Sequence, residues 1–207
     1  MPGFSSPTPL AVLLSGGGRT FEYLAEWLAG RPDLARIVLV ISDRASAGGL
    51  ARAERRGVPS RVLPCRTPAD SAAIFAALEG AGAELAILGG FLRLLRVPPR
   101  WLGRVLNIHP SLIPRHSGAG FYGDRVHRAA LDAGDRESGC TAHFVDDAYD
   151  HGPAIDRGVV PIEPGDTAES LAARVFAMER IVYPRAIERV LRGEVSFAGA
   201  GGALRSR

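Results

Sequence analysis

Short runs of apolar residues alternate with helical patterns along the first half of the chain. Residues 10–14 form the first apolar run, a glycine-rich turn follows at residues 15–18, and a helical pattern covers residues 20–28. This order recurs, with further predicted strands at residues 37–41, 61–63, 85–88 and 104–108 and further predicted helices at residues 47–56 and 69–81. Continuous apolar strands separated by helices are typical of a parallel sheet with both faces covered. The pattern therefore predicts a doubly wound α/β fold.

The pattern changes after Pro110, where a loop rich in Pro, Gly and His begins. A helix is predicted over residues 123–133, and strands at residues 139–145 and 155–160 are predicted to extend the sheet as antiparallel strands. A long amphipathic helix is predicted over residues 167–192, and Pro184 is expected to kink or break it, because proline lacks a backbone donor and clashes with the preceding turn. The expected sheet is mostly parallel, with helices on both faces and antiparallel strands added in the C-terminal half.

Length and composition predict one globular domain. The chain has 207 residues, of which 46% are hydrophobic and 23% are charged. We expect residues 1–207 to form a single domain, with a core at about residues 10–192 and flexible ends at residues 1–9 and 197–207. No apolar run approaches the roughly 20 residues of a membrane span, and the first ten residues lack the pattern of a signal peptide. A cytoplasmic protein without membrane contact is expected.

Charge and cysteine content exclude several chemistries. The net charge is +3 and every basic residue is an arginine, so Schiff-base and lysine-nucleophile chemistries are excluded. Arg52, Arg55 and Arg56 have helical spacing, which indicates a solvated helix face rather than a nucleic-acid patch. Cys65 and Cys140 lie far apart in the sequence, which predicts reduced, buried thiols. We expect small anionic substrates and no nucleic-acid partner.

The glycine-rich turn before the first helix predicts an anion site. Unpaired N–H groups at a helix start, together with the helix dipole, bind an anion, and a single phosphate fits a turn of this length. A dinucleotide site would have the pattern Gly-x-Gly-x-x-Gly, but Phe21 occupies the last of these positions. A tight turn that binds nothing is the alternative.

Asn107 and His109 carry the second candidate site. Alternation along a strand places both side chains on one face, at the carboxyl end of a buried strand, where open α/β sheets bind ligands. An amide donor beside an imidazole could stabilise an oxyanion and move a proton during acyl transfer. The alternative is a hydrogen-bonded structural histidine before the change of direction at Pro110.

An acidic segment at residues 146–150 supplies the third candidate. Asp146 or Asp147 could cap the turn that this segment forms. Asp150 beside His109 would raise the pKa of the imidazole from its reference value of about 6.5 and would fix its orientation.

The histidines do not predict a metal site. His109, His116, His127, His143 and His151 show none of the spacings of known ligand sets. His127, inside a predicted helix, and His143, on a predicted strand, are expected to be structural.

These segments together resemble a known family. The motif Asn-x-His-Pro-Ser-Leu-x-Pro at residues 107–114, with Asp-x-Gly-Pro at residues 150–153, is specific to folate-dependent formyltransferases. With the glycine-rich turn and the segment Gly-Gly-Phe-Leu-Arg-Leu-Leu at residues 89–95, the chain resembles the phosphoribosylglycinamide formyltransferase family of purine biosynthesis. The resemblance extends from about residue 10 to residue 192.

The resemblance implies an activity and a set of roles. The family transfers a formyl group from 10-formyltetrahydrofolate, a cosubstrate, to the amine of glycinamide ribonucleotide, without a metal or a tightly bound cofactor. By position, the catalytic residues would be Asn107, His109 and Asp150. The substrate-binding residues would be Gly17, Gly18, Arg19, Thr20 and Glu179. The folate-binding residues would be Leu92, Arg93, Leu94, Leu95, Asp146, Asp147, Ala148 and Tyr149. A monomer or a homodimer is expected.

The chain departs from the family pattern in two places. Arg19-Thr20 replaces a common Ser-Asn in the phosphate turn, and Arg19 could add a charged phosphate contact. Residues 115–126 form a longer, glycine-rich loop. The related formyltetrahydrofolate deformylases and methionyl-tRNA formyltransferases carry an additional domain, so the length of this chain disfavours both. A non-catalytic nucleotide-binding module is the alternative from a different class.

Overall fold

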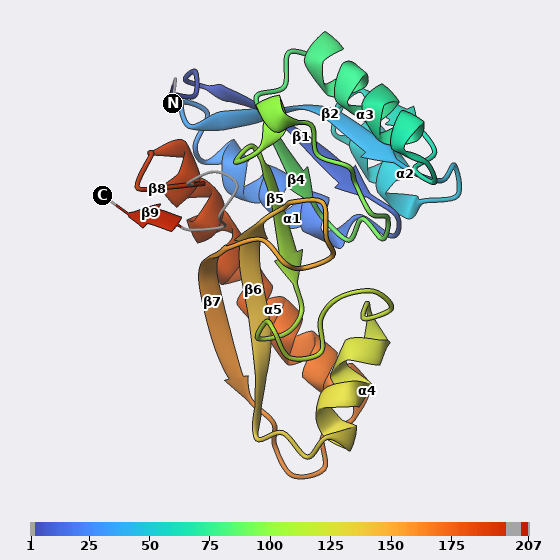
Figure 1. Cartoon of the computed structure of the whole chain (residues 1–207), viewed down its shortest axis with the longest axis vertical. Helices are drawn as coiled ribbons and strands as arrows, with labels where there is room; N and C mark the ends of the chain where they lie inside the picture. The colour runs from blue at the N-terminus through green and yellow to red at the C-terminus, as the bar shows by residue number, and fades with distance from the viewer. Residues whose placement is uncertain (1–2, 198–203, 207) are drawn as a thin grey trace.

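The computed structural model describes residues 3–197 and 204–206, and its centre is a seven-stranded sheet of order β3-β2-β1-β4-β5-β6-β7. The strands are β1 (Thr8–Leu14), β2 (Ala35–Ser42), β3 (Ser60–Val62), β4 (Leu85–Leu88), β5 (Val105–His109), β6 (Glu137–Phe144) and β7 (Ala154–Pro161). β1 to β5 pair in parallel, and β6 and β7 are antiparallel (Figure 1). The predicted fold class is confirmed.

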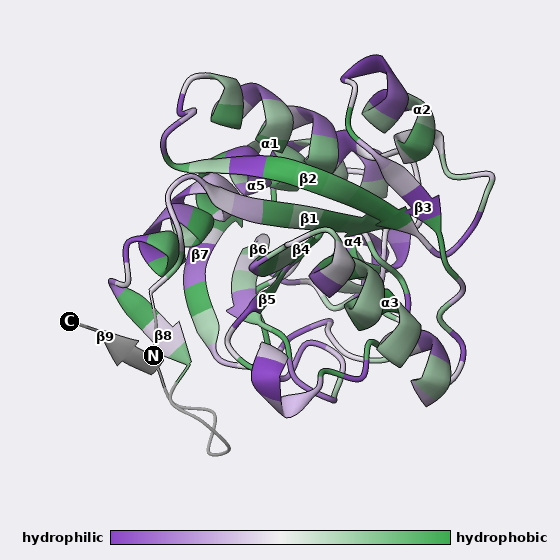
Figure 2. Ribbon diagram, turned by 90° about the horizontal axis from the view of Figure 1, so that it is seen from above, coloured by the Kyte–Doolittle hydropathy of each residue, from purple (hydrophilic) through white to green (hydrophobic). Residues whose placement is uncertain are grey.

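Helices cover both faces of the sheet. They are α1 (Arg19–Ala29), α2 (Gly48–Arg55), α3 (Pro68–Gly80), α4 (Asp124–Asp132) and α5 (Ala168–Leu191), with a short 3-10 helix at Pro99–Trp101. Figure 2 shows α1 and α3 on opposite sides of the strongly hydrophobic strands β1 and β2. The predicted helices are all present, with ends within a few residues of those expected.

Alternation along β1 divides the core into two clusters. Leu10, Val12 and Leu14 pack in the cluster that includes α1 and α5, whereas Ala11 and Leu13 pack in the cluster that includes α3. A strand buried on both faces has no polar side, which explains why the sequence of β1 is continuously apolar.

Pro184 does not break the last long helix, so the prediction of a break there is wrong. α5 runs from Ala168 to Leu191 with Pro184 inside it. Proline removes the hydrogen-bond donor for the carbonyl four residues earlier, and here that carbonyl belongs to Arg180, which is exposed. Pro184 itself is buried, so its packing against the core compensates for the missing bond.

The described parts of both ends make defined contacts. Ser5 bonds Glu84 through its backbone N–H and its hydroxyl, at 2.9 and 2.5 Å. β8 (Val195–Phe197) pairs with β9 (Leu204–Ser206), and the Phe197 ring packs edge-on against Phe144. The expected flexible ends also include residues 1–2, 198–203 and 207, which lie outside the described residues. Among the described residues, no helix has the length and apolar character to cross a bilayer.

Both cysteines are buried and free, as the sequence predicts.

One buried hydroxyl ties α5 to the centre of the sheet. Tyr183 is fully buried, and its hydroxyl lies 3.0 Å from the carbonyl oxygen of Leu88 on β4 and 2.9 Å from that of Leu106 on β5. Leu106 directly precedes Asn107, so this contact fixes the strand that carries two of the candidate catalytic residues.

We expect Tyr183→Phe to lower the free energy of unfolding by about 1–2 kcal/mol, because two buried carbonyls lose their donor. Urea denaturation measures this loss. Tyr23→Phe is the matched control, because the buried Tyr23 hydroxyl has no hydrogen-bond partner among the described residues. Equal losses in the two variants would contradict the role given to Tyr183.

Candidate active site

A cleft of about 490 Å³ opens at the carboxyl ends of the central parallel strands. Its walls are the turn after β1 at residues 16–20, the segment after β4 at residues 89–92, the end of β5 at residues 107–110, and the loop at residues 118–124. β1 and β4 are neighbours at the point where the chain reverses its direction across the sheet. Open α/β sheets bind ligands at such a point.

The structure brings the three predicted catalytic residues together in this cleft. Asn107 and His109 point to the same side from β5, and Asp150 approaches from the loop between β6 and β7. The His109 Nδ1 atom lies 3.3 Å from Asp150 Oδ2, and Asn107 Nδ2 donates to Asp150 Oδ1 at 3.3 Å. The juxtaposition that the sequence could only suggest is therefore present.

Burial changes the expected protonation of His109. The ring is 4% exposed, and burial lowers its pKa below the ordinary value of 6.5, although the Asp150 carboxylate and the His116 carbonyl act in the opposite direction. Asp150 acts to raise the pKa of His109, as expected, but desolvation of the charged ring outweighs the carboxylate, so the net shift is downward. This downward shift favours the neutral ring at pH 7.

Asp150 stays ionised in the same environment. Burial acts to raise its pKa, but the His143 ring, the His109 ring and the Gly118 amide together hold the pKa below the usual value of 3.8. The Gly118 N–H donates to Asp150 Oδ2 at 2.9 Å. The cleft therefore holds a carboxylate that can accept a proton or a hydrogen bond from a ligand.

His143 was expected to be structural, and the structure shows that it contacts the catalytic group. It pairs with Asn107 across β5 and β6. Its Nδ1 atom lies 2.7 Å from the Phe144 carbonyl oxygen, which can only accept, so Nδ1 carries the hydrogen. In a neutral ring Nε2 is then an acceptor for Asn107 Nδ2, 3.1 Å away, and the same atom lies 3.6 Å from Asp150 Oδ1. His143 thereby fixes which way the Asn107 amide points.

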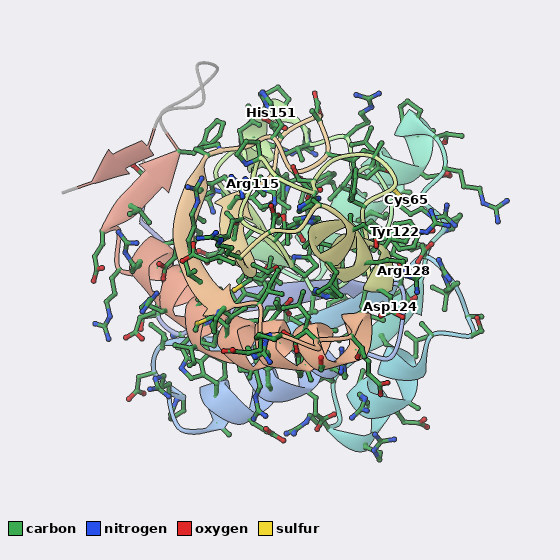
Figure 3. All side chains as sticks on the ribbon, turned by 90° about the horizontal axis from the view of Figure 1, so that it is seen from below. Cys65, Arg115, Tyr122, Asp124, Arg128 and His151 are labelled. Atoms are coloured by element: carbon green, nitrogen blue, oxygen red, sulfur yellow. The ribbon has the colours of Figure 1, made fainter. Side chains whose placement is uncertain are left out.

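His127 also differs from expectation. It was predicted to be a satisfied structural histidine, but it lines the cleft, is 5% exposed, and its Nδ1 atom has no hydrogen-bond partner among the described residues. It lies on α4, three residues after Asp124, which Figure 3 labels. No group of three or more potential metal ligands occurs in the part of the chain that the structure describes.

The predicted phosphate turn forms one end of the cleft. Gly18 has φ 74° and directly precedes α1, and a Cβ atom there would lie 2.6 Å from the Cα atom of Gly49. Gly17, Gly18, Arg19 and Thr20 all line the cleft. The first N–H groups of α1 are available to an anion there.

Arg19 and Glu179 face each other across this end. The Arg19 guanidinium lies 4.1 Å from the centre of the Phe176 ring, and Phe176 and Glu179 both project from α5 into the cleft. Glu179 is 9% exposed, and burial raises its pKa to about 7, while the charge of Arg19 opposes this rise. A carboxyl that titrates near neutrality can donate as well as accept hydrogen bonds.

Only two of the eight predicted folate-binding residues line the cleft, namely Leu92 and Tyr149. Both side chains are exposed, at 38% and 41%. They come from the two segments that the family resemblance assigned to the folate.

The other six residues of this set do not line the cleft. Arg93 forms an ion pair with Asp43 at 2.8 Å, and Leu95 is buried in the core, with Leu94 half-buried beside it in sequence. Asp146 Oδ1 accepts from the Ala148 N–H at 3.0 Å, and Asp147 Oδ1 accepts from the Val97 N–H at 2.9 Å. The bond between Val97 and Asp147 links the chain after β4 to the loop before β7.

Comparisons with known proteins agree with this site. A family model described as formyl transferase matches residues 9–187. The trifunctional purine biosynthetic protein adenosine-3 of Gallus gallus is 41% identical over 199 residues, which cover 93% of this chain but 19% of that protein. The chloroplastic phosphoribosylglycinamide formyltransferase of Arabidopsis thaliana is 33% identical, with coverage of 93% and 68%. This chain thus spans about a fifth of the first of these relatives and two thirds of the second.

A solved structure has the same fold. Glycinamide ribonucleotide transformylase 1 from Symbiobacterium toebii superposes with a TM-score of 0.86 at 35% identity, and the match covers 96% of this chain and 93% of that one.

We expect the Glu179 carboxyl to titrate with a midpoint near pH 7, because burial disfavours its charged form. Carbon-13 NMR of glutamate-labelled protein, compared with Glu179→Gln, measures the midpoint directly. Arg19→Leu removes the opposing charge and should raise the midpoint further.

The same shift predicts a change of stability with pH. The folded state favours the protonated carboxyl, so its ionisation destabilises the fold as pH rises from 4.5 to about 7. Glu179→Gln should therefore gain stability relative to the unchanged protein between pH 5 and pH 8, by on the order of 3 kcal/mol. A midpoint near 4.5 would contradict both expectations.

Proposed function

Because the chain belongs to the formyl transferase family, we propose that it transfers the formyl group of 10-formyltetrahydrofolate to the amine of 5'-phosphoribosylglycinamide. The observation that carries this proposal is the convergence of Asn107, His109 and Asp150 in a cleft whose other end is the glycine turn before α1. A site that only binds nucleotides needs the turn but not the three polar groups. We further propose that residues 10–192 make up one formyltransferase domain.

The phosphate of the acceptor fits the turn. Gly17 and Gly18 allow a ligand to approach the backbone, and the N–H groups at the start of α1 provide donors together with the positive end of the helix dipole. Arg19 adds a positive charge beside them, and the Thr20 hydroxyl adds a polar group. Glu179 lies at the same end and would bind a hydroxyl or amide group of the acceptor.

The formyl-folate would lie between the segment after β4 and the loop before β7. Leu92 and Tyr149 offer exposed apolar surface there. The other predicted folate-binding residues would contribute by giving these two segments their shape; they are Arg93, Leu94, Leu95, Asp146, Asp147 and Ala148. Burying an aromatic folate ring against apolar side chains supplies binding free energy, and it leaves the formyl carbon near the three polar groups.

The reaction then balances without any further reagent. The acceptor amine attacks the formyl carbon, a new C–N bond forms, and the carbonyl oxygen takes up the negative charge. Asn107 donates a hydrogen bond to this oxyanion. His109 takes the proton that the amine loses, and the positive charge of the resulting ring beside Asp150 stabilises the oxyanion further. The bond between the formyl carbon and N10 of the folate breaks, and N10 receives that proton. The products are the formylated amine and tetrahydrofolate.

The lengths of the existing hydrogen bonds support a choice of the donor that would turn to the oxyanion. The contacts of Asn107 and His109 to Asp150 are both 3.3 Å, which is long for a charge-assisted bond. The contact of Asn107 with His143 is shorter, at 3.1 Å. A developing oxyanion competes best with the longest contact, so Asn107 would turn the hydrogen that now faces Asp150 toward the substrate. A cytoplasmic location and a monomer or homodimer stay predictions.

Formyl transfer to glycinamide ribonucleotide, followed by mass spectrometry of the formylated product, tests this proposal. We expect Asn107→Ala, His109→Ala and Asp150→Asn each to lower kcat by about 10²–10³, as loss of an oxyanion donor does. Asp156→Asn is the matched control, because Asp156 pairs with Arg185 outside the cleft.

Two results would overturn the proposal. One is near-full activity in any of the three variants, which would remove that residue from the mechanism. The other is release of free formate by the unchanged protein at the same rate with and without the acceptor amine, which would indicate a deformylase.

We expect His143→Leu to lower kcat by about tenfold to a hundredfold while both KM values change little, because a misoriented Asn107 amide affects the transition state most. His143→Gln keeps an acceptor for Asn107 and should recover much of the rate. Steady-state kinetics of both variants checks this. Equal rates for His143→Leu and His143→Gln would show that His143 acts through packing alone.

A further inference from the structure

His116 has an unusual backbone conformation beside the candidate catalytic histidine. Its φ is 48°, and the only other described residue besides glycine with a positive φ is Asp150, at 51°. Such a conformation is unfavourable for a residue with a Cβ atom and persists only where its surroundings hold it. Both of these residues contact the ring of His109.

A hydrogen bond to Asp135 holds the His116 side chain in place. Its Nε2 atom lies 2.7 Å from Asp135 Oδ2, and the His116 side chain is 18% exposed. The ring of Phe121 packs against it with the ring centres 6.3 Å apart. Asp135 is itself fixed at the end of α4, where its N–H donates to the Ala130 carbonyl at 3.1 Å.

The conformation aims the His116 carbonyl oxygen at His109 Nε2, 2.9 Å away. A carbonyl oxygen can only accept, so Nε2 carries the hydrogen of the neutral ring. Nδ1 is then left with its lone pair toward Asp150 Oδ2, at 3.3 Å. The neutral His109 ring donates a hydrogen bond only to the His116 carbonyl, whereas a protonated ring can donate to Asp150 as well.

We propose that His116 and Asp135 are positioning residues for His109, and that the hydrogen bond between their side chains keeps the His116 carbonyl on Nε2 so that His109 takes up the reaction's proton at Nδ1. The role of this proton rests on the proposed function. The acceptor amine gives the proton up as its C–N bond forms, Nδ1 holds it beside Asp150, and N10 of the departing folate receives it. No other proton donor or acceptor is required.

The surrounding charges are compatible with this role. Three titratable groups act on His109, namely Asp150 in the loop after β6, His143 on β6 and His127 on α4. Arg115, whose side chain is 68% exposed, contacts the second oxygen of Asp135 at 3.3 Å (Figure 3). Arg115 therefore provides a matched control, because it shares the carboxylate but its side chain does not hold the His116 ring.

Nitrogen-15 NMR of histidine-labelled protein tests the proposal without substrates, with the His109 signals identified by their loss in His109→Ala. We expect the unchanged protein and Arg115→Ala to show His109 as the Nε2–H tautomer. Asp135→Ala and His116→Gly should show a mixture of tautomers, and the pKa of His109 should fall by about one unit, since a hydrogen bond that favours the charged ring is lost. His116→Gly tests the ring alone, because glycine adopts the positive φ freely.

Kinetics provides the second readout. At pH 7.5, Asp135→Ala should lower kcat of formyl transfer by about tenfold, with both KM values within about twofold, and Arg115→Ala should retain the full rate. An unchanged His109 tautomer and titration in Asp135→Ala and His116→Gly would overturn the proposal whatever their activity. If the tautomer changes as expected but the unchanged protein transfers no formyl group, the proposed function fails and the positioning of His109 stands.

Discussion

The buried carboxylate of Asp150 is the constraint on which the cleft depends. It approaches His109, Asn107 and the Gly118 amide within 3.3 Å, and these partners lie on a strand and a loop 32 to 43 residues earlier in the sequence. A buried charge is tolerated only where hydrogen bonds replace its hydration. The turn that presents it is equally constrained, because a Cβ atom on Gly152 would lie 2.0 Å from the Phe144 carbonyl oxygen. The site therefore assembles only when the Asp-x-Gly-Pro segment packs against β6.

The sheet explains why these groups meet at this place. The parallel strands β1, β4 and β5 end at one edge, so the glycine turn and the pair on β5 face the same cleft. The change to antiparallel pairing at β6 then returns the chain beside β5, and the cross-strand partner of Asn107 becomes His143. The helix α4 lies between β5 and β6 in the chain, yet β6 runs antiparallel to β5 and lies directly beside it. This antiparallel addition allows two consecutive strands to build the candidate catalytic face.

Periodicity predicted the sheet, the helices and the shared face of Asn107 and His109, because alternation and apolar runs are local properties. The approach of Asp150 came from the family resemblance, since no local pattern specifies a contact across 41 residues or more. The contact of His143 depends on strand register, which the sequence does not show. The helix through Pro184 survives because tertiary packing outweighs a local preference. The pKa of His109 depends on its burial, which exists only in the folded chain.

A neutral His109 beside an ionised Asp150 suits a reaction in which charge appears only briefly. In the proposed reaction the amine and the formyl carbonyl are both neutral before attack, and a permanent imidazolium would lose hydration with no oxyanion to offset it. Once the oxyanion forms, two negative groups flank the ring, and in a water-excluded cleft their attraction for a proton is far stronger than in solution. The affinity of Nδ1 for a proton therefore rises at the moment when the amine must lose one. Burial lowers the resting pKa of His109, and the same burial enlarges the response of that pKa to the transition state.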